Sequence, residues 1–391
     1  MGVDAIIAGA LRSKRSSNDA AAPPSLELHQ PGRRQSLLAI DLARGLAALS
    51  VFVYHYGVAG ALVELTGISA FRWVAIPGAR WAVPFFFAIS GFCIHLSEIS
   101  FLERTGRQSL DLRLYARRRF WRIYPTYAFA LLFSCTIVAL RGESLGVRDF
   151  LIHAANLQAL DQAAFNSINV VLWSVSVEML LYLIYPVWLW LRLRVGLIGA
   201  FSIGCGISLA TSAIVATCVE TPVPSPAQWF FVNLWAGWLA GAALAEGMTK
   251  RPELFRTATW WIVGVAAWLL GLGWQSFDSE SAWSLCFNGS LLTVLTLWPL
   301  SGMVLAEPWF HAVRQPVVKY AIAWVGACGL CSYSLYLLHE PLIHVRMSLV
   351  AGVENMTLRL AAIVVGFPAI VGCCWLSYVV VELPFMKYRG K

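Results

Sequence analysis

Charged residues are scarce in this chain of 391 residues: they make up 13% of it, whereas 59% of the residues are hydrophobic and 18 are tryptophan. A soluble protein of this length could not cover its surface with so few charges. Long polar stretches are also lacking after residue 35, which leaves no room for a soluble catalytic domain. The composition therefore predicts an integral membrane protein of the all-α class.

Signatures of metal, disulfide and serine-hydrolase sites are lacking as well. All nine cysteines fall within apolar runs, so we expect no structural disulfides. Cys328 and Cys331 form a C-x-x-C, but a zinc site usually needs a second pair or suitably spaced histidines, and we interpret the two as small apolar side chains at a helix start. G-x-S-x-G, the hydrolase elbow, is missing. We expect no metal and no permanently bound cofactor.

What the chain does contain is a series of apolar runs, each long enough to cross about 30 Å of hydrocarbon. They cover residues 37–58, 74–97, 120–140, 168–191, 195–217, 228–246, 258–275, 283–305, 320–343 and 359–381. The expected fold is a polytopic bundle of about ten transmembrane helices.

The distribution of lysine and arginine predicts the orientation of this bundle. If both termini are cytoplasmic, 22 of the 29 basic residues fall on the cytoplasmic side, as short loops in membrane proteins require. This asymmetry accounts for the net charge of +8 without a nucleic-acid partner. Residues 1–35 are polar and read as a flexible cytoplasmic tail, 36–383 as one membrane domain and 384–391 as a short cytoplasmic tail. The tail is not expected to be a signal peptide, because Asp4 stands where positive charge is required.

The first apolar run carries Asp41, Arg44 and His55, which are expensive to bury. A charge at membrane depth costs at least ~2.5–3.5 kcal/mol and usually marks function. On a helix, the eleven steps from Arg44 to His55 return to within about 20° of the same face and span about 16 Å. One stripe thus places a cation near one membrane surface and an imidazole near the other.

A carboxylate lies in the fourth run, where Ser174, Glu178 and Tyr182 share one helix face at four-residue spacing. A carboxylate inside a membrane needs a partner, and His55 or one of the arginines would serve. A polar clamp between helices is the competing interpretation.

Three further spans contribute candidates. Ser90-Gly91 in the second run allows close backbone approach and a hydrogen bond from Ser90. Gly237 and Gly241 form a G-x-x-x-G that is typical of closely packed helices. His339 in the ninth run is expected at the depth of His55, either as a second site residue or as a structural histidine. Glu382 and Pro384 are interpreted as a helix stop at the cytoplasmic surface.

A basic and aromatic cluster straddles the cytoplasmic end of the third run, from Arg117 to Pro125. Arginine binds phosphate through two parallel hydrogen bonds and stays charged when partly desolvated. The cluster could therefore receive a phosphorylated donor, with Arg119, Arg122 and Tyr124 closest to it. Ordinary positive-inside anchoring with an aromatic belt explains the same composition.

Over residues 36–387 these clusters follow the order found in acyltransferase family 3, and the chain resembles that family, which includes bacterial O-antigen, exopolysaccharide and nodulation-factor O-acetyltransferases. The motifs that carry the resemblance are Asp41-x-x-Arg44-Gly45 with His55, Phe86-Phe87-x-x-Ser90-Gly91-Phe92, Arg119-Phe120-x-Arg122-Ile123-Tyr124-Pro125, Trp173-Ser174-x-Ser176-Val177-Glu178, Tyr333-Ser334-Leu335-Tyr336-Leu337-x-His339-x-Pro341 and Glu382-x-Pro384. The polar tail departs from the family pattern. Some relatives append an extracellular hydrolase-like domain, which is absent here, so we expect transfer to finish within the membrane part.

The resemblance implies a multi-pass enzyme of the bacterial cytoplasmic (inner) membrane. It would move an acyl group, most often acetyl, from cytoplasmic acyl-CoA to a hydroxyl of an envelope polysaccharide, lipopolysaccharide or lipid-linked glycan. Arg119 and Arg122 would hold the CoA phosphates, and Arg44 would orient the donor.

At the acceptor, His55 would act as general base or carry the acyl group covalently. Glu178 would hydrogen-bond His55 and fix its tautomer. Oxyanion stabilisation is assigned to the hydroxyl side chains Ser90, Ser174 or Tyr182.

Two other classes remain compatible with the residues. A proton-coupled transporter or flippase could use Asp41, Arg44, His55 and Glu178 as a proton relay. Such a relay does not require the cytoplasmic arginine cluster. A membrane sensor or scaffold without turnover is the third possibility.

Overall fold

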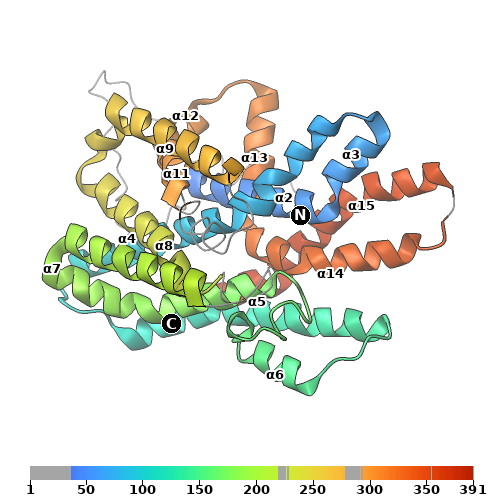
Figure 1. Cartoon of the computed structure of the whole chain (residues 1–391), viewed down its shortest axis with the longest axis horizontal. Helices are drawn as coiled ribbons and strands as arrows, with labels where there is room; N and C mark the ends of the chain where they lie inside the picture. The colour runs from blue at the N-terminus through green and yellow to red at the C-terminus, as the bar shows by residue number, and fades with distance from the viewer. Residues whose placement is uncertain are drawn as a thin grey trace. The chain divides into compact units, whose positions relative to one another are not determined.

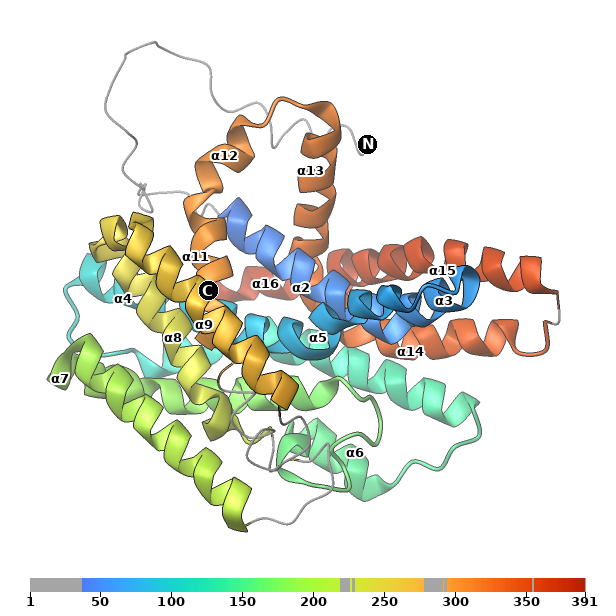
Figure 2. The same ribbon diagram turned by 45° about the horizontal axis from the view of Figure 1, so that its top comes forward.

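The computed structural model describes residues 37–218, 226, 229–277, 291, 294–353 and 355–390, so the predicted tail over 1–35 lies outside the described residues. Within these ranges every regular element is a helix (Figures 1 and 2). The α-helices are α2 Leu38–Tyr56, α3 Val58–Thr66, α4 Ala82–Thr105, α5 Leu112–Leu140, α6 Val147–Ala154, α7 Leu172–Cys218, α8 Phe231–Lys250, α9 Ala258–Phe277, α11 Leu297–Leu305, α12 Glu307–Ala312, α13 Pro316–Leu330, α14 Ser332–Val350, α15 Met356–Ser377 and α16 Leu383–Met386. Short 3-10 or π turns are η1 Ser69–Ala75, η2 Pro77–Trp81, η3 Gln158–Leu160, η4 Pro252–Arg256, η5 Tyr378–Glu382 and η6 Lys387–Gly390.

Five helical segments in the described residues are long and apolar enough to cross a membrane. They are Leu38–Tyr56, Ser69–Thr105, Leu112–Leu140, Leu172–Cys218 and Ala361–Met386. The pair α13 and α14 is a sixth candidate if the two are counted as one broken span. The chain is thus a helical membrane protein, and the number of ten spans stays a prediction.

Helix α7 consists of two helices joined by a turn at Gly196. The backbone of Gly196 has φ 79° and ψ 172°, which is not helical and which glycine adopts without a steric penalty. The indole of Trp188 donates a hydrogen bond of 3.1 Å to the carbonyl of Ala200 across this turn. The two halves, which meet at the turn in Figure 1, correspond to the two runs predicted over 168–191 and 195–217.

The apolar run predicted as a span over 320–343 is not one continuous helix. The chain bends by 79° between α13 and α14, with the break at Cys331. Hydropathy averaged over the length of a span does not reveal this bend, because the polar stretch Ser332-Tyr333-Ser334 beside it is short and has apolar residues on both sides. Cys328 and Cys331 lie buried at the bend as free thiols.

Helix α2, which carries the predicted stripe, packs against α13, α14 and α4. Two glycines let α13 approach its backbone closely. A Cβ atom on Gly45 would collide with the carbonyl oxygen of Val325, and one on Gly329 would collide with that of Asp41. No side chain larger than hydrogen fits at either position.

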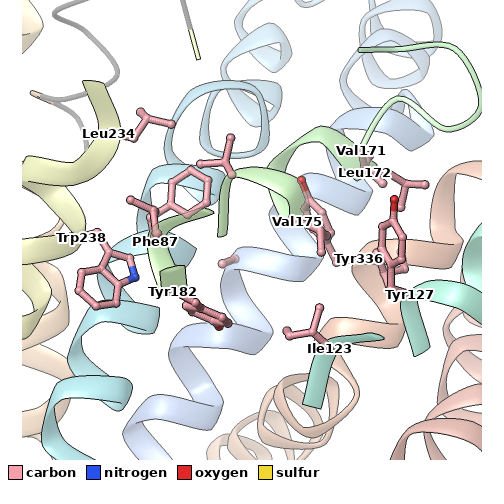
Figure 3. Packing of buried hydrophobic residues seen from close by; sticks show 14 of the residues in the cluster. Phe87, Ile123, Tyr127, Val171, Leu172, Val175, Tyr182, Leu234, Trp238 and Tyr336 are labelled. Carbon is pink, nitrogen blue, oxygen red and sulfur yellow. The ribbon is translucent and has the colours of Figure 1, made fainter. Parts of the chain in front are cut away.

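A second close crossing joins α4 to α8. A Cβ on Gly91 would collide with the carbonyl oxygen of Trp238, and one on Gly241 with that of Ala88. The predicted close approach is therefore confirmed at Ser90-Gly91 and at Gly241 of the G-x-x-x-G. The buried core beside this crossing includes Phe87, Trp238 and Tyr182 (Figure 3).

The N-terminus of α2 is capped from a distant part of the chain. The carboxylate of Glu307, at the start of α12, accepts hydrogen bonds from the backbone N–H groups of Leu38 (3.0 Å) and Ala39 (2.6 Å). These N–H groups have no partner within their own helix. A carboxylate at a helix N-terminus also interacts favourably with the helix dipole. Glu307 thereby anchors the start of α2.

Candidate active site

Arg44 and His55 lie on α2, which runs without a break between them. The guanidinium of Arg44 lies 3.8 Å from the carboxylate of Asp41, one turn earlier, and donates to the sulfur of Cys93 at 3.4 Å. Asp41 is buried and Arg44 is half-buried. The helix thus carries a cation near its start and an imidazole in its last turn, as the sequence predicted.

Two histidines from distant parts of the chain meet in this site. Nδ1 of His55 lies 2.8 Å from Nε2 of His339, and the two rings are stacked, with centroids 5.1 Å apart and planes 11° from parallel. His339 is fully buried, whereas His55 is partly exposed. The structure thus brings together the two histidines that the sequence placed at one depth.

The hydrogen bonds of His339 determine the tautomer of both rings. Nδ1 of His339 lies 2.9 Å from the carbonyl oxygen of Leu335. A carbonyl only accepts, so this nitrogen carries a proton, and Nε2 of the neutral ring is an acceptor. Nδ1 of His55 must then donate to it. The unprotonated nitrogen of His55 is Nε2, which is the atom a general base or nucleophile needs.

Glu178 is the centre of a second polar cluster, between α4 and α7. The hydroxyl of Ser90 donates to its carboxylate at 2.8 Å, and Tyr182 donates to the same oxygen. The indole of Trp238 donates to Ser90 at 3.4 Å. Tyr182 and Trp238 lie in the core that Figure 3 shows.

The predicted hydrogen bond between Glu178 and His55 is not made among the described side chains. His55 pairs with His339 instead, because the bend after α13 brings α14 against α2. Ser174 bonds the hydroxyl of Tyr336 at 2.8 Å, and the ring of Tyr336 lies 6.0 Å from that of His339. These two residues therefore connect the histidine pair to the helix face of Glu178.

The arginines predicted to bind phosphate are paired with buried carboxylates. Arg119 donates to Glu98 at 2.9 Å, and Arg122 donates to Glu382 at 2.7 Å. Tyr124 donates to the carbonyl of Ala154 at 2.8 Å. Much of the positive charge of the two guanidinium groups is therefore neutralised within the protein.

The interpretation of Glu382 as a helix stop at the surface is wrong. Its side chain is 1% exposed, and its second oxygen accepts from Ser334 at 2.8 Å. The helical backbone continues past it through α16. A buried carboxylate needs an opposite charge, and Arg122 supplies it.

Comparisons with known proteins show the family to which this chain belongs. The model of acyltransferase family 3, described as an acyltransferase domain, matches residues 37–379. The chain belongs to this family. It is also 25% identical over 334 residues to peptidoglycan O-acetyltransferase OatA of Listeria monocytogenes serovar 1/2a, which covers 79% of this chain and 50% of that protein. The chain therefore spans about half the length of this relative. No solved structure matches the chain.

The acyltransferase domain contains buried charges that the sequence reasoning passed over. Glu98 is 1% exposed and neutralises Arg119. His95, fully buried, lies 3.0 Å from the carboxylate of Glu246, which Arg192 also binds. Glu246 is the last residue of the run predicted over 228–246, and Glu98 directly follows the run over 74–97, so the rule that singled out Glu178 would have found both if it had been applied to the ends of the runs.

Proposed function

We propose that this member of acyltransferase family 3 transfers an acyl group, acetyl in the first instance, from cytoplasmic acyl-CoA to a hydroxyl of an envelope polysaccharide, lipopolysaccharide or glycolipid. Family membership supports acyl transfer, and the relative is by name an O-acetyltransferase. The observation that carries the proposal is the hydrogen bond between His55 and His339, which leaves Nε2 of His55 unprotonated.

In the proposed reaction, Nε2 of His55 takes the proton from the acceptor hydroxyl as its oxygen attacks the thioester carbonyl carbon. The carbon–sulfur bond breaks, CoA leaves as a thiolate, and the imidazolium returns the proton to sulfur. The N–H at Nδ1 of His55 donates to His339 throughout and keeps the ring oriented. A covalent route uses the same nitrogen: Nε2 attacks the thioester carbonyl carbon, the carbon–sulfur bond breaks, and CoA leaves as a thiolate. The acyl-imidazolium then passes the acyl group to the acceptor oxygen, and the proton of the acceptor hydroxyl goes to the CoA sulfur.

The remaining candidates surround this reaction. Arg44 stands about 16 Å from His55 along α2, since a helix rises 1.5 Å per residue, and we assign it to orienting the donor. We assign Ser90, Ser174 and Tyr182 to the polar surroundings of Glu178, whose carboxylate accepts hydrogen bonds from Ser90 and Tyr182. Asp41 forms an ion pair with Arg44. In the proposed orientation both termini lie on the cytoplasmic side of a bacterial inner membrane. The donor would then enter from the side of Arg44 and the acceptor from the side of His55.

A transfer assay tests this function against the rival transporter. The full chain in nanodiscs is incubated with isotopically labelled acetyl-CoA and an envelope glycan fraction, and free CoA thiol and labelled glycan are measured. We expect thiol release that depends on the glycan, and one added acetyl mass on the glycan by mass spectrometry. A transporter would leave acetyl-CoA intact.

His339 is expected to act as a positioning residue for His55. The variant His339→Ala removes the acceptor for the Nδ1 proton, so the tautomer of His55 is no longer fixed; we expect kcat to fall on the order of 10²-fold while KM for acetyl-CoA stays unchanged. In His339→Gln the amide oxygen can accept the same proton, and part of the activity should return. Steady-state kinetics of both variants check this. Equal kcat in the alanine variant and the wild type would refute the role.

A further inference from the structure

A cleft opens where the end of α4, the turn within α7 and the end of α8 meet. Its volume is about 650 Å³, within the range of small-molecule sites. Its polar lining includes four cations and a carboxylate, and one tryptophan forms part of the wall. These residues are Glu103, Arg107, Trp190, Arg192, Arg194 and Lys250.

The cations of the cleft differ in how they are held. Arg192 and Lys250 both bind Glu246, and the side chain of Arg192 is only 15% exposed. Two of the five N–H groups of Arg192 bond Glu246, so the others stay available as donors in a fixed orientation. Behind them, Glu246 lies 3.0 Å from the buried ring of His95. One wall of the cleft is therefore preorganised.

Arg194 is an exposed cation of the cleft that stacks on an aromatic ring. Its guanidinium lies over the ring of Trp190, 5.4 Å from the centroid. In the part of the chain that the structure describes, no carboxylate lies within ion-pair distance of Arg194. Arg107, which follows the end of α4, is also exposed and pairs with Asp111 at 3.1 Å. An anion entering the cleft would thus meet one unpaired guanidinium beside an aromatic surface.

We infer that this cleft binds the phosphate-bearing nucleotide end of the acyl donor. Arginine forks bind phosphate through two parallel hydrogen bonds, and the ring of Trp190 offers a stacking surface for the base. Along α7, Arg192 lies 14 residues from Glu178, which corresponds to about 21 Å at 1.5 Å per residue. A pantetheine arm extended from the cleft covers a distance of this order and would reach the cluster of Glu178, whose helix face Ser174 and Tyr336 connect to the histidine pair. The inference rests on the proposed function, and it assigns the donor phosphates to a place other than Arg119 and Arg122, which buried carboxylates already neutralise.

Binding measurements on the full chain in nanodiscs test the cleft. The probes are CoA and adenosine 3′,5′-bisphosphate, and the variants are Arg194→Gln and Trp190→Leu, both at exposed positions. Arg314→Gln, at an exposed arginine that does not line the cleft, is the matched control. We expect each cleft variant to weaken both probes on the order of tenfold and to raise KM for acetyl-CoA similarly, with kcat at saturation and the control unchanged.

The outcomes separate the cleft from the function. If both cleft variants bind CoA with unchanged affinity and still transfer acetyl groups, the inference that the cleft binds the donor is wrong, and the proposed function is retained. Acylation of glycan without any acyl-CoA would overturn the proposed donor itself. A parallel titration in nanodiscs with and without anionic phospholipid identifies the other source of phosphate: if Arg194→Gln changes the lipid dependence and not CoA binding, the occupant is a lipid headgroup and the inference is wrong.

Discussion

Replacement of His55 by alanine is expected to lower the rate of acyl transfer by about 10²–10⁴-fold, the contribution typical of a general base. In the part of the chain that the structure describes, the imidazole that contacts His55 is that of His339, and it cannot take the place of His55 because its ring is fully buried and an acceptor hydroxyl cannot reach it. A covalent acyl-imidazole route would be lost in the same variant. The transfer assay in nanodiscs measures both the loss of labelled glycan and the loss of thiol release.

A second substitution on the same helix separates catalysis from folding. Leu46 is exposed on α2, and Leu46→Ala should keep wild-type activity. Both variants should elute from size exclusion as the wild type does, since a partly exposed imidazole at the end of a helix adds little to packing. If His55→Ala transferred acetyl to glycan at the wild-type rate, the assignment of His55 would have to be abandoned.

Substitution of Gly241 is expected to lower the stability of the protein strongly. Even Gly241→Ala would press a methyl group into the carbonyl of Ala88, and α4 and α8 would have to separate. Overpacking of this kind typically costs about 1–3 kcal/mol, and more when the obstacle is backbone. Separation of the two helices would also pull Trp238 away from Ser90, which bonds Glu178. We expect a large drop in Tm and in acyl transfer together.

A glycine with free space around it provides the comparison. A Cβ on Gly206, in the second half of α7, would meet nothing within 4 Å. Gly206→Ala should therefore leave Tm unchanged or raise it, because alanine loses less entropy than glycine in a helix, a difference of roughly 0.5–1 kcal/mol. Thermal unfolding followed by fluorescence reports both variants. The same Tm for Gly241→Ala and the wild type would contradict the close crossing.

The sequence predicted those features that local spacing determines. Arg44 and His55 share α2 because eleven residues make about three helical turns, and the apolar run carries no breaker between them. Gly91 and Gly241 were recognisable as contact points because small residues concentrate where membrane helices touch. The depth of His339 followed from the order of the spans alone, and its ring does meet His55.

Features that depend on which helices become neighbours could not be predicted. Glu178 was expected to bond His55, but the choice between His339 and a carboxylate depends on a bend at Cys331 that hydropathy averaged over a span does not reveal. The partners of Arg119 and Arg122 lie 21 and 260 residues away, respectively. Such pairs follow from tertiary packing, which the spacing of residues along one helix does not determine.

The capping carboxylate of Glu307 determines the position of His55 along the axis of α2 and its rotation about that axis. It accepts hydrogen bonds from the first free N–H groups of α2, so a shift of the helix along its axis would break both bonds. A slip by one residue would displace His55 by about 1.5 Å and rotate it about 100° away from His339. The short helix α12, although it is assigned no part in the chemistry, thus sets the alignment of the imidazole from the opposite end of α2.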